Sequence, residues 1–198
     1  MDGGMSYEQF ILCVNKFLEV SNMLNDGWSL VGSLEKIGHG YIKKCFAVRD
    51  AKHSYSPETP VFEEVDDLYS GFCDDNAVSE FSPEMKLTWE YHVVYNTSYA
   101  VPELFFNVWK RNGVLLSLDE IWSMVPAAFS DRLHHDKWDF ITQQEHPICR
   151  RPFFHLHPCH TSDILRNLRV SRNLLVSWLS TVGGAVGLNI DQHYASIV

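Results

Sequence analysis

The segment His157-Pro158-Cys159-His160 places a cysteine between a proline and two histidines. A short apolar segment precedes it, and Thr161 or Ser162 can cap a helix that the pattern predicts from Asp163 onward. Amide dipoles at a helix start, and a neighbouring imidazolium, favour a thiolate over a thiol. We therefore expect Cys159 to be a nucleophile; the alternative is that it is simply a buried free cysteine, which is common.

His155, His157 and Cys159 alternate along the same segment, which would place three potential zinc ligands on one face of a strand. Further imidazoles occur at His134, His135, His146 and His160. Zinc ligands usually come as two close pairs with a spacer, and no second cysteine follows Cys159 at the spacing of the zinc deaminases. A zinc-binding domain is therefore an alternative rather than the leading interpretation.

Helices are predicted at both ends of the chain, where apolar residues recur at three- and four-residue steps. The predicted helices cover about residues 6–24, 118–125, 163–172 and 174–182. Ser6 with Gln9, and Ser117 with Glu120, form two capping boxes that mark helix starts. The third helix would expose a stripe of arginines on one side, at Arg166, Arg169 and Arg172.

The predicted strands lie between these helices. Strand-like patterns cover about residues 28–35, 41–49, 87–95 and 104–109, and a brief extended segment covers 153–156. Tyr99 lies just past the end of the third strand, which we expect to pair with the fourth at the centre of the sheet. The order indicates an α+β fold with an N-terminal helix, a four-stranded antiparallel sheet and C-terminal helices.

Composition limits the class of protein. A chain of 198 residues with 45% apolar and 13% aromatic residues has enough material for one core, which excludes general disorder and predicts a single domain over 1–198. Of its 25 acidic residues, nine lie between Pro57 and Glu84, where Lys and Arg are absent, so we expect an acidic loop insert at about 51–85. The other 16 balance the 16 Lys and Arg, which makes nucleic acid an unfavourable partner.

The sequence shows no targeting signal that we identify. Its start, Met1-Asp2-Gly3-Gly4, lacks the basic and apolar segments of a signal peptide, and no run approaches the roughly 18 apolar residues of a membrane span. Five scattered cysteines, an odd number, do not indicate a disulfide framework. We expect a cytoplasmic protein without stable membrane insertion.

Two segments together resemble a known family. Residues 138–147 (WDFITQQEHP), followed by residues 151–161 (RPFFHLHPCHT), resemble the ubiquitin-like-conjugating enzymes of autophagy, the autophagy-related protein ten family. Upstream, residues 88–95 (TWEYHVVY) and the nearby segment 98–102 match the sheet of the same family. The His-Pro-Cys-x-Thr block is the specific element, and the likeness covers about residues 86–182.

The resemblance implies an E2-like, UBC-related fold and a relay in which Cys159 accepts the C-terminal glycine of a ubiquitin-like modifier as a thioester. In that family the modifier is autophagy-related protein twelve, and the E1-like enzyme that supplies it is autophagy-related protein seven. The acceptor, whose lysine receives the modifier, is autophagy-related protein five. No cofactor or metal is implied, and a monomer is the default expectation.

The transfer step needs hydrogen-bond donors, because an amine that attacks a thioester creates an oxyanion. Ubiquitin E2 enzymes supply the asparagine of a His-Pro-Asn motif, which this sequence lacks upstream of Cys159. We expect His157 and Tyr99 as donors, although His157 could instead only fix the loop and Tyr99 only cap the core. A second set of donors comprises Gln143, Gln144 and His146. These would otherwise satisfy backbone groups in a long loop before the site.

Two alternatives to this enzyme remain at the level of sequence. The first is a catalytically silent binding module of the same fold, in which the cysteine motif survives only as a structural turn. The second is the zinc-binding domain built on His155, His157 and Cys159. A thiol-sensitive adduct with the modifier would distinguish the enzyme from both.

Overall fold

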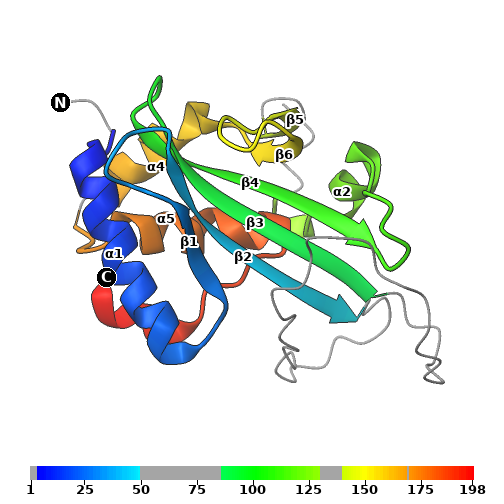
Figure 1. Ribbon diagram of the computed structural model, residues 1–198, viewed down its shortest axis with the longest axis horizontal. Helices are drawn as coiled ribbons and strands as arrows, with labels where there is room; N and C mark the ends of the chain where they lie inside the picture. The colour runs from blue at the N-terminus through cyan, green and yellow to red at the C-terminus, as the bar shows by residue number, and fades with distance from the viewer. Residues whose placement is uncertain (1–3, 50–85, 130–139, 169) are drawn as a thin grey trace.

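The computed structural model of the protein describes residues 4–49, 86–129, 140–168 and 170–198 (Figure 1). The acidic segment at about 51–85, the pair His134-His135 and Arg169 lie outside these residues. The predictions made for them therefore stay predictions.

The chain opens with helix α1 (Tyr7–Leu24), as its capping box predicts. The Ser6 hydroxyl accepts a hydrogen bond from the Gln9 N–H, and the Gln9 side chain accepts one from the Ser6 N–H. Both bonds satisfy amides that a helix start leaves unpaired. Asn25 ends the helix in the left-handed conformation. The apolar stripe is fully buried at Phe10, Val14 and Phe17.

A six-stranded sheet crosses the molecule. Its strands are β1 (Trp28–Gly32), β2 (Gly40–Arg49), β3 (Lys86–Asn96), β4 (Val101–Lys110), β5 (Ile141–Glu145) and β6 (Pro152–Leu156). They lie in the order β1-β2-β3-β4-β6-β5, and every neighbouring pair is antiparallel. The α+β class and the central β3–β4 pair are as predicted, but the prediction of four strands was wrong.

Of the two additional strands, β6 matches the brief extended segment predicted over 153–156, and β5 carries a weak sequence signal for a physical reason. β5 lies at the sheet edge and buries only Ile141, so its polar remainder shows no alternation. β6 does carry an apolar pattern, but its ladder with β4 consists of only two residue pairs, Phe105↔His155 and Phe106↔Phe154. We had placed Gln143 and Gln144 in a loop, and they lie in β5 instead.

The other helical segments are short. They are α2 (Leu118–Met124), η1 (Ala127–Phe129), η2 (Pro158–His160), α4 (Thr161–Asn167), α5 (Leu174–Val182), η3 (Gly183–Val186) and η4 (Gln192–Ile197). The predicted capping box at Ser117 and Glu120 is present at α2, and α5 has its predicted bounds.

The predicted helix over 163–172 is shorter than expected, because α4 begins at Thr161 and ends at Asn167. Arg172 therefore lies beyond the helix, and Arg166 pairs with exposed Asp163 at 2.8 Å. Further along the chain, Asn173 is fully buried and caps α5.

The first and last helical segments pack against each other. The Asn173 side chain donates a hydrogen bond to the Cys13 carbonyl of α1 at 3.0 Å. In η4, the Tyr194 ring stacks on Phe17 with centroids 4.5 Å apart, and its hydroxyl donates to the Asp26 carboxylate at 3.0 Å. The core of the fold is thus closed by segments from opposite ends of the sequence.

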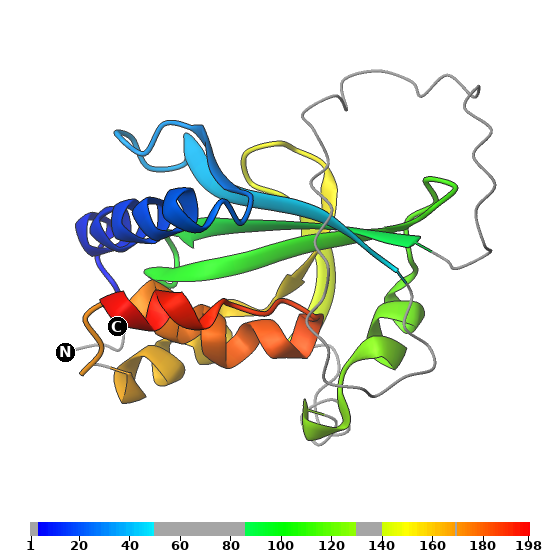
Figure 2. The same ribbon diagram turned by 90° about the horizontal axis from the view of Figure 1, so that it is seen from below.

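The two faces of the sheet are buried differently. Helices α4 and α5 and the segment η4 lie along one face, over the main core (Figure 2). The opposite face holds a smaller apolar cluster of Tyr41, Val94, Phe105 and Phe153. That face also buries polar side chains, among them Glu90, His92, Glu103 and His155. Within the described residues, no helix combines the length and apolarity that spanning a bilayer requires.

Candidate active site

Cys159 lies in η2, between strand β6 and helix α4, so the predicted junction of an extended segment with a helix start is confirmed. Pro158 is buried at the first position of this turn, and Cys159 itself is half-buried rather than sealed in the core. A segment with a fixed proline and a partly accessible thiol can present sulfur to an incoming acyl group.

His157 is the N-cap of the same turn. Its Nδ1 accepts a hydrogen bond from the Cys159 backbone N–H at 3.2 Å. In a neutral imidazole the nitrogen that accepts carries no proton, so the proton is on Nε2. His157 therefore fixes the loop, as one of the two interpretations of the sequence predicted. It also keeps an N–H donor on the other side of its ring.

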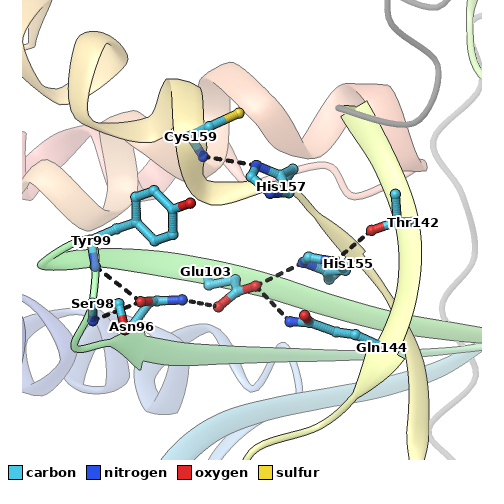
Figure 3. A network of polar contacts seen from close by, with 9 residues as sticks. All are labelled: Asn96, Ser98, Tyr99, Glu103, Thr142, Gln144, His155, His157 and Cys159. Carbon is cyan, nitrogen blue, oxygen red and sulfur yellow. Dashed lines mark hydrogen bonds and ion pairs between the residues drawn. The ribbon is translucent and has the colours of Figure 1, made fainter.

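Tyr99 lies in the turn between β3 and β4, and its side chain is 48% exposed, so it does not cap the core. Its ring centroid is 6.1 Å from that of His157, at an interplanar angle of 76°. Figure 3 shows the Tyr99 ring extending toward His157 and Cys159. The structure thus brings together the three residues that we expected to form the site.

The turn that carries Tyr99 is held by backbone hydrogen bonds to the Asn96 side chain. Asn96 Oδ1 accepts from the N–H groups of Ser98 at 3.0 Å and Tyr99 at 3.1 Å. Ala100 follows with a φ of 52°, in the left-handed region that a residue with a Cβ rarely adopts. Its carbonyl accepts from the Met5 N–H at 2.7 Å. The turn is therefore fixed from both sides.

Glu103, which we did not predict as a site residue, lies at the centre of a buried network beside this turn. It is 3% exposed and accepts hydrogen bonds from Asn96 Nδ2 at 2.8 Å, Gln144 Nε2 at 3.0 Å and His155 Nδ1 at 2.7 Å. His155 Nε2 lies 2.6 Å from Thr142 Oγ1. Figure 3 shows this network joining β3, β4, β5 and β6 below Cys159.

The sequence does contain a signal for this network. Glu103 lies among the apolar residues at the start of β4, and an acidic side chain on a buried strand face requires hydrogen-bond donors. What cannot be read from the sequence is that β6 brings His155 to the same face, since the β4–β6 pairing spans some 50 residues.

The predicted zinc set is not assembled. His155 already uses both ring nitrogens, with Glu103 and Thr142, and His157 Nδ1 accepts from the Cys159 amide. The residues of the second set of predicted donors do not lie together. Gln144 binds Glu103, and Gln143 is exposed in β5. His146 is buried and lies beside His92. None of these three is therefore assigned as an oxyanion donor.

His146 belongs to a second polar chain on the same sheet face. Its Nδ1 accepts from the N–H groups of Ile148 and Cys149, each at 3.2 Å. Nε2 of a neutral His146 then donates to His92 Nδ1 at 3.1 Å, and His92 Nε2 donates to Glu90 at 3.1 Å. Each nitrogen in the chain has a partner of the right kind when both rings are neutral.

The electrostatics agree with neutral rings. Burial, together with His92 and Arg151, lowers the pKa of His146 to about 3. Burial also lowers the pKa of His92, against the opposing effect of Glu90. Burial alone would raise the pKa of Glu90, but hydrogen bonds from His92 and Lys43 outweigh it and lower the value to about 2. The row of hydrogen bonds from His146 through His92 therefore ends on the ionised carboxylate of Glu90.

Among the described residues, one group brings metal-ligand atoms together, namely His92, His146 and Cys149, within 4.8 Å of one another. A metal on His146 Nε2 would move the proton of that ring to Nδ1, which faces two backbone N–H groups. The donor set therefore does not fit a metal, and we derive no chemistry from one.

Comparison with known proteins identifies the family. The family model described as "Autophagocytosis associated protein, active-site domain" matches residues 9–193. A human protein named ubiquitin-like-conjugating enzyme ATG10 is 34% identical over 195 residues, covering 91% of this chain and 87% of its own. A protein of the same name from Arabidopsis thaliana is 43% identical over 112 residues, covering 52% of this chain and 50% of its own.

A family match over most of the chain, together with a human relative that aligns along nearly its whole length, bears out the resemblance found in the sequence. The chain belongs to the autophagocytosis-associated family of ubiquitin-like-conjugating enzymes and is an E2-like transferase of autophagy.

Proposed function

We propose that Cys159 carries a ubiquitin-like modifier as a thioester and passes it to a lysine of an acceptor protein. The observation that supports this most is the placement of a half-buried cysteine in a capped turn, with the side chains of His157 and Tyr99 beside it. Both neighbours carry a polar hydrogen, and both come from segments with fixed backbones.

Charging is a transthiolation. The Cys159 thiolate attacks the carbonyl carbon of the thioester on the E1-like enzyme, a new C–S bond forms, and the E1 cysteine leaves as a thiolate. A free cysteine with a pKa of about 8.5 is only a few per cent ionised at neutral pH. The rate of this step therefore depends on how much of Cys159 is present as thiolate.

Transfer is an aminolysis. The lysine amine attacks the thioester carbonyl, the negative charge moves to the carbonyl oxygen, and the C–S bond then breaks to release the Cys159 thiolate while the amine loses a proton. The intermediate is stabilised by donors directed at the oxygen. The Tyr99 hydroxyl and the His157 Nε2–H are the donors that we assign to this role in place of the asparagine of ubiquitin E2 enzymes.

The partners follow from the family to which the chain belongs. We infer that the modifier is autophagy-related protein twelve, that autophagy-related protein seven supplies it, and that autophagy-related protein five accepts it. By the same inference, residues 1–198 form a single domain with an E2-like, UBC-related fold. We also infer that the protein is a cytoplasmic monomer that binds no nucleic acid and needs no cofactor or metal.

The decisive experiment incubates the protein with the E1-like enzyme, the modifier and ATP. Wild-type protein should give an adduct that a thiol reductant removes, and Cys159→Ser should give an oxyester that resists the reductant. Cys149→Ser is the matched control, because Cys149 is also half-buried but lies in the β5–β6 loop. It should keep the thiol-sensitive adduct.

Other outcomes would overturn the proposal. No adduct with wild-type protein would favour a catalytically silent module. A thiol-sensitive adduct on Cys159→Ser would show that another cysteine is the nucleophile. One equivalent of tightly bound zinc would favour the metal-binding alternative.

A further inference from the structure

We propose that Glu103 is a positioning residue, whose buried carboxylate fixes the orientation of the Asn96 amide and thereby places Tyr99 beside His157 and Cys159 for the transfer step. The inference rests on the proposed function, since it assumes that Tyr99 acts on the thioester at Cys159. It assigns no contact between Glu103 and substrate.

The first step of the argument is the chemistry of the carboxylate. An ionised carboxylate can only accept hydrogen bonds, so each side chain that contacts it must present an N–H or O–H. Asn96 therefore turns its Nδ2 toward Glu103, at 2.8 Å, and its Oδ1 away from it. The charge of Glu103 thus selects one of the two orientations of the amide.

The second step is what that orientation does to the turn. Asn96 Oδ1 accepts from the backbone N–H groups of Ser98 and Tyr99. If the amide reversed, its oxygen would face the carboxylate and its NH₂ would face two backbone N–H groups, so every contact of Asn96 would become repulsive. The conformation of the turn therefore depends on Glu103 being an acceptor.

Burial does not replace these bonds. The Tyr99 side chain is 48% exposed, so packing alone cannot fix where its hydroxyl lies. The adjacent Ala100 holds a left-handed φ of 52°, an unfavourable conformation that persists only where surrounding bonds impose it. The hydrogen bonds that the Ser98 and Tyr99 N–H groups donate to Asn96 Oδ1 are among these surrounding bonds.

The third step concerns the other side of the site. The second oxygen of Glu103 accepts from His155 Nδ1 and Gln144 Nε2. His155 lies two residues before His157 on the strand that leads to Cys159. This side-chain contact therefore adds to the short β4–β6 ladder in connecting strand β4, which follows the turn bearing Tyr99, with strand β6, which leads to His157.

The test separates charging from transfer. In Glu103→Gln, one acceptor becomes an NH₂ group that must oppose either Asn96 or the His155 and Gln144 donors. We expect thioester formation at Cys159 at the wild-type rate and transfer to the acceptor lysine slowed at least about tenfold. Glu120→Gln is the matched control, because Glu120 accepts from Ser117 in the capping box of α2 and pairs with Lys110, so it shares no partner with Glu103, and the transfer rate of this variant should not change.

A second substitution should restore the hydrogen-bond pattern. In the double variant Asn96→Asp with Glu103→Gln, the new amide donates to Asp and still accepts from His155 and Gln144, while Asp accepts from the Ser98 and Tyr99 amides. Every donor again has an acceptor. We expect this variant to recover most of the transfer rate.

A third comparison shows whether the effect passes through Tyr99. Tyr99→Phe should itself slow transfer, and adding Glu103→Gln to it should cost no more than about twofold further. A merely structural role for Glu103 would instead give the same loss in both backgrounds. Thermal melts accompany each variant; should Glu103→Gln not fold, Asn96→Ala removes the same turn contacts and must show the same loss dependent on Tyr99.

The outcomes are distinct from those of the proposed function. If wild-type protein charges and transfers normally but Glu103→Gln does so too, or if its loss is equal in the Tyr99→Phe background, the positioning role is wrong and the role of Cys159 stands. If wild-type protein forms no thioester at Cys159, both proposals fail together.

Discussion

The rings of Tyr99 and His157 meet nearly edge to face, with centroids 6.1 Å apart. The two residues come from a turn between central strands and from the cap of a short helical segment. Two side chains from distant parts of the sequence therefore lie beside Cys159 (Figure 3).

His157 should tolerate asparagine better than alanine. An Asn side chain can accept from the Cys159 amide through Oδ1, as Nδ1 does now, and still donate through Nδ2. We expect His157→Asn to keep most of the transfer rate and His157→Ala to lose about tenfold to a hundredfold. Single-turnover discharge of the thioester to the acceptor measures both. Equal rates for the two variants would show that His157 serves neither as cap nor as donor.

The left-handed backbone of Ala100 predicts a gain in stability on substitution by glycine. Glycine adopts φ near 52° without the clash that a Cβ creates, so Ala100→Gly should raise the free energy of unfolding by about 1 kcal/mol. Gly113→Ala is the reverse control, because Gly113 has a φ of 75° and open space around its Cα. It should lower the free energy by a similar amount. Urea denaturation at pH 7.5 gives both values.

The Tyr91 hydroxyl predicts a difference between two Tyr→Phe variants. Tyr91 is fully buried and donates to the Val186 carbonyl at 2.7 Å, so Tyr91→Phe leaves a core carbonyl without that donor and should cost about 1–3 kcal/mol. Tyr95 donates to the Met5 carbonyl at 2.8 Å in a partly buried site, where water can replace it. Tyr95→Phe should cost less than about 1 kcal/mol. A reversed order in urea titrations would contradict this.

The His92–His146 pair predicts acid sensitivity of the fold. In the unfolded chain each histidine takes up a proton near pH 6.5, whereas the pKa of His146 in the folded protein is about 3 and that of His92 is lowered by burial. The unfolded state therefore binds more protons, and stability falls as the pH drops below 6.5. For each such histidine the loss is at most about 1.4 kcal/mol per pH unit.

Between pH 6.5 and 4.5 the histidines can be observed apart from Glu90. The pKa of Glu90 is lowered to about 2 in the folded protein, so its contribution to the free energy of unfolding is lost only in more acidic solution. In His146→Asn, the side chain can still accept from the Ile148 and Cys149 amides but no longer titrates. Its free energy of unfolding should fall less steeply between pH 7 and 5 than that of wild-type protein. Parallel slopes would exclude His146 as the source.

Much of the fold could be predicted because local signals agree with the final packing. Ser6 with Gln9, and Ser117 with Glu120, cap helices where the sequence placed them. The alternation of β3 places Tyr91 and Val93 on the main core, as expected for a strand between two partners. A motif and the ends of elements also led us to Cys159, His157 and Tyr99, which the structure places side by side and whose roles stay predictions.

What could not be predicted depends on contacts between distant segments. β5 was missed because an edge strand with one buried residue carries no periodicity. α4 is shorter than predicted, and Asn173, which follows it, binds the Cys13 carbonyl of α1, a contact between segments 160 residues apart. The partners of Glu103 depend on the β4–β6 register, which no spacing in the sequence records.

The packing of α1 against the end of the chain bears on the timing of folding. Because Cys13, Phe17 and Asp26 find their partners at Asn173 and Tyr194, helix α1 cannot reach these native contacts until the chain has been synthesised as far as Tyr194. Contacts of such long sequence separation slow folding. We therefore expect the amphipathic helix α1 to stay exposed, and available to chaperones, while the segments between it and Tyr194 are being synthesised.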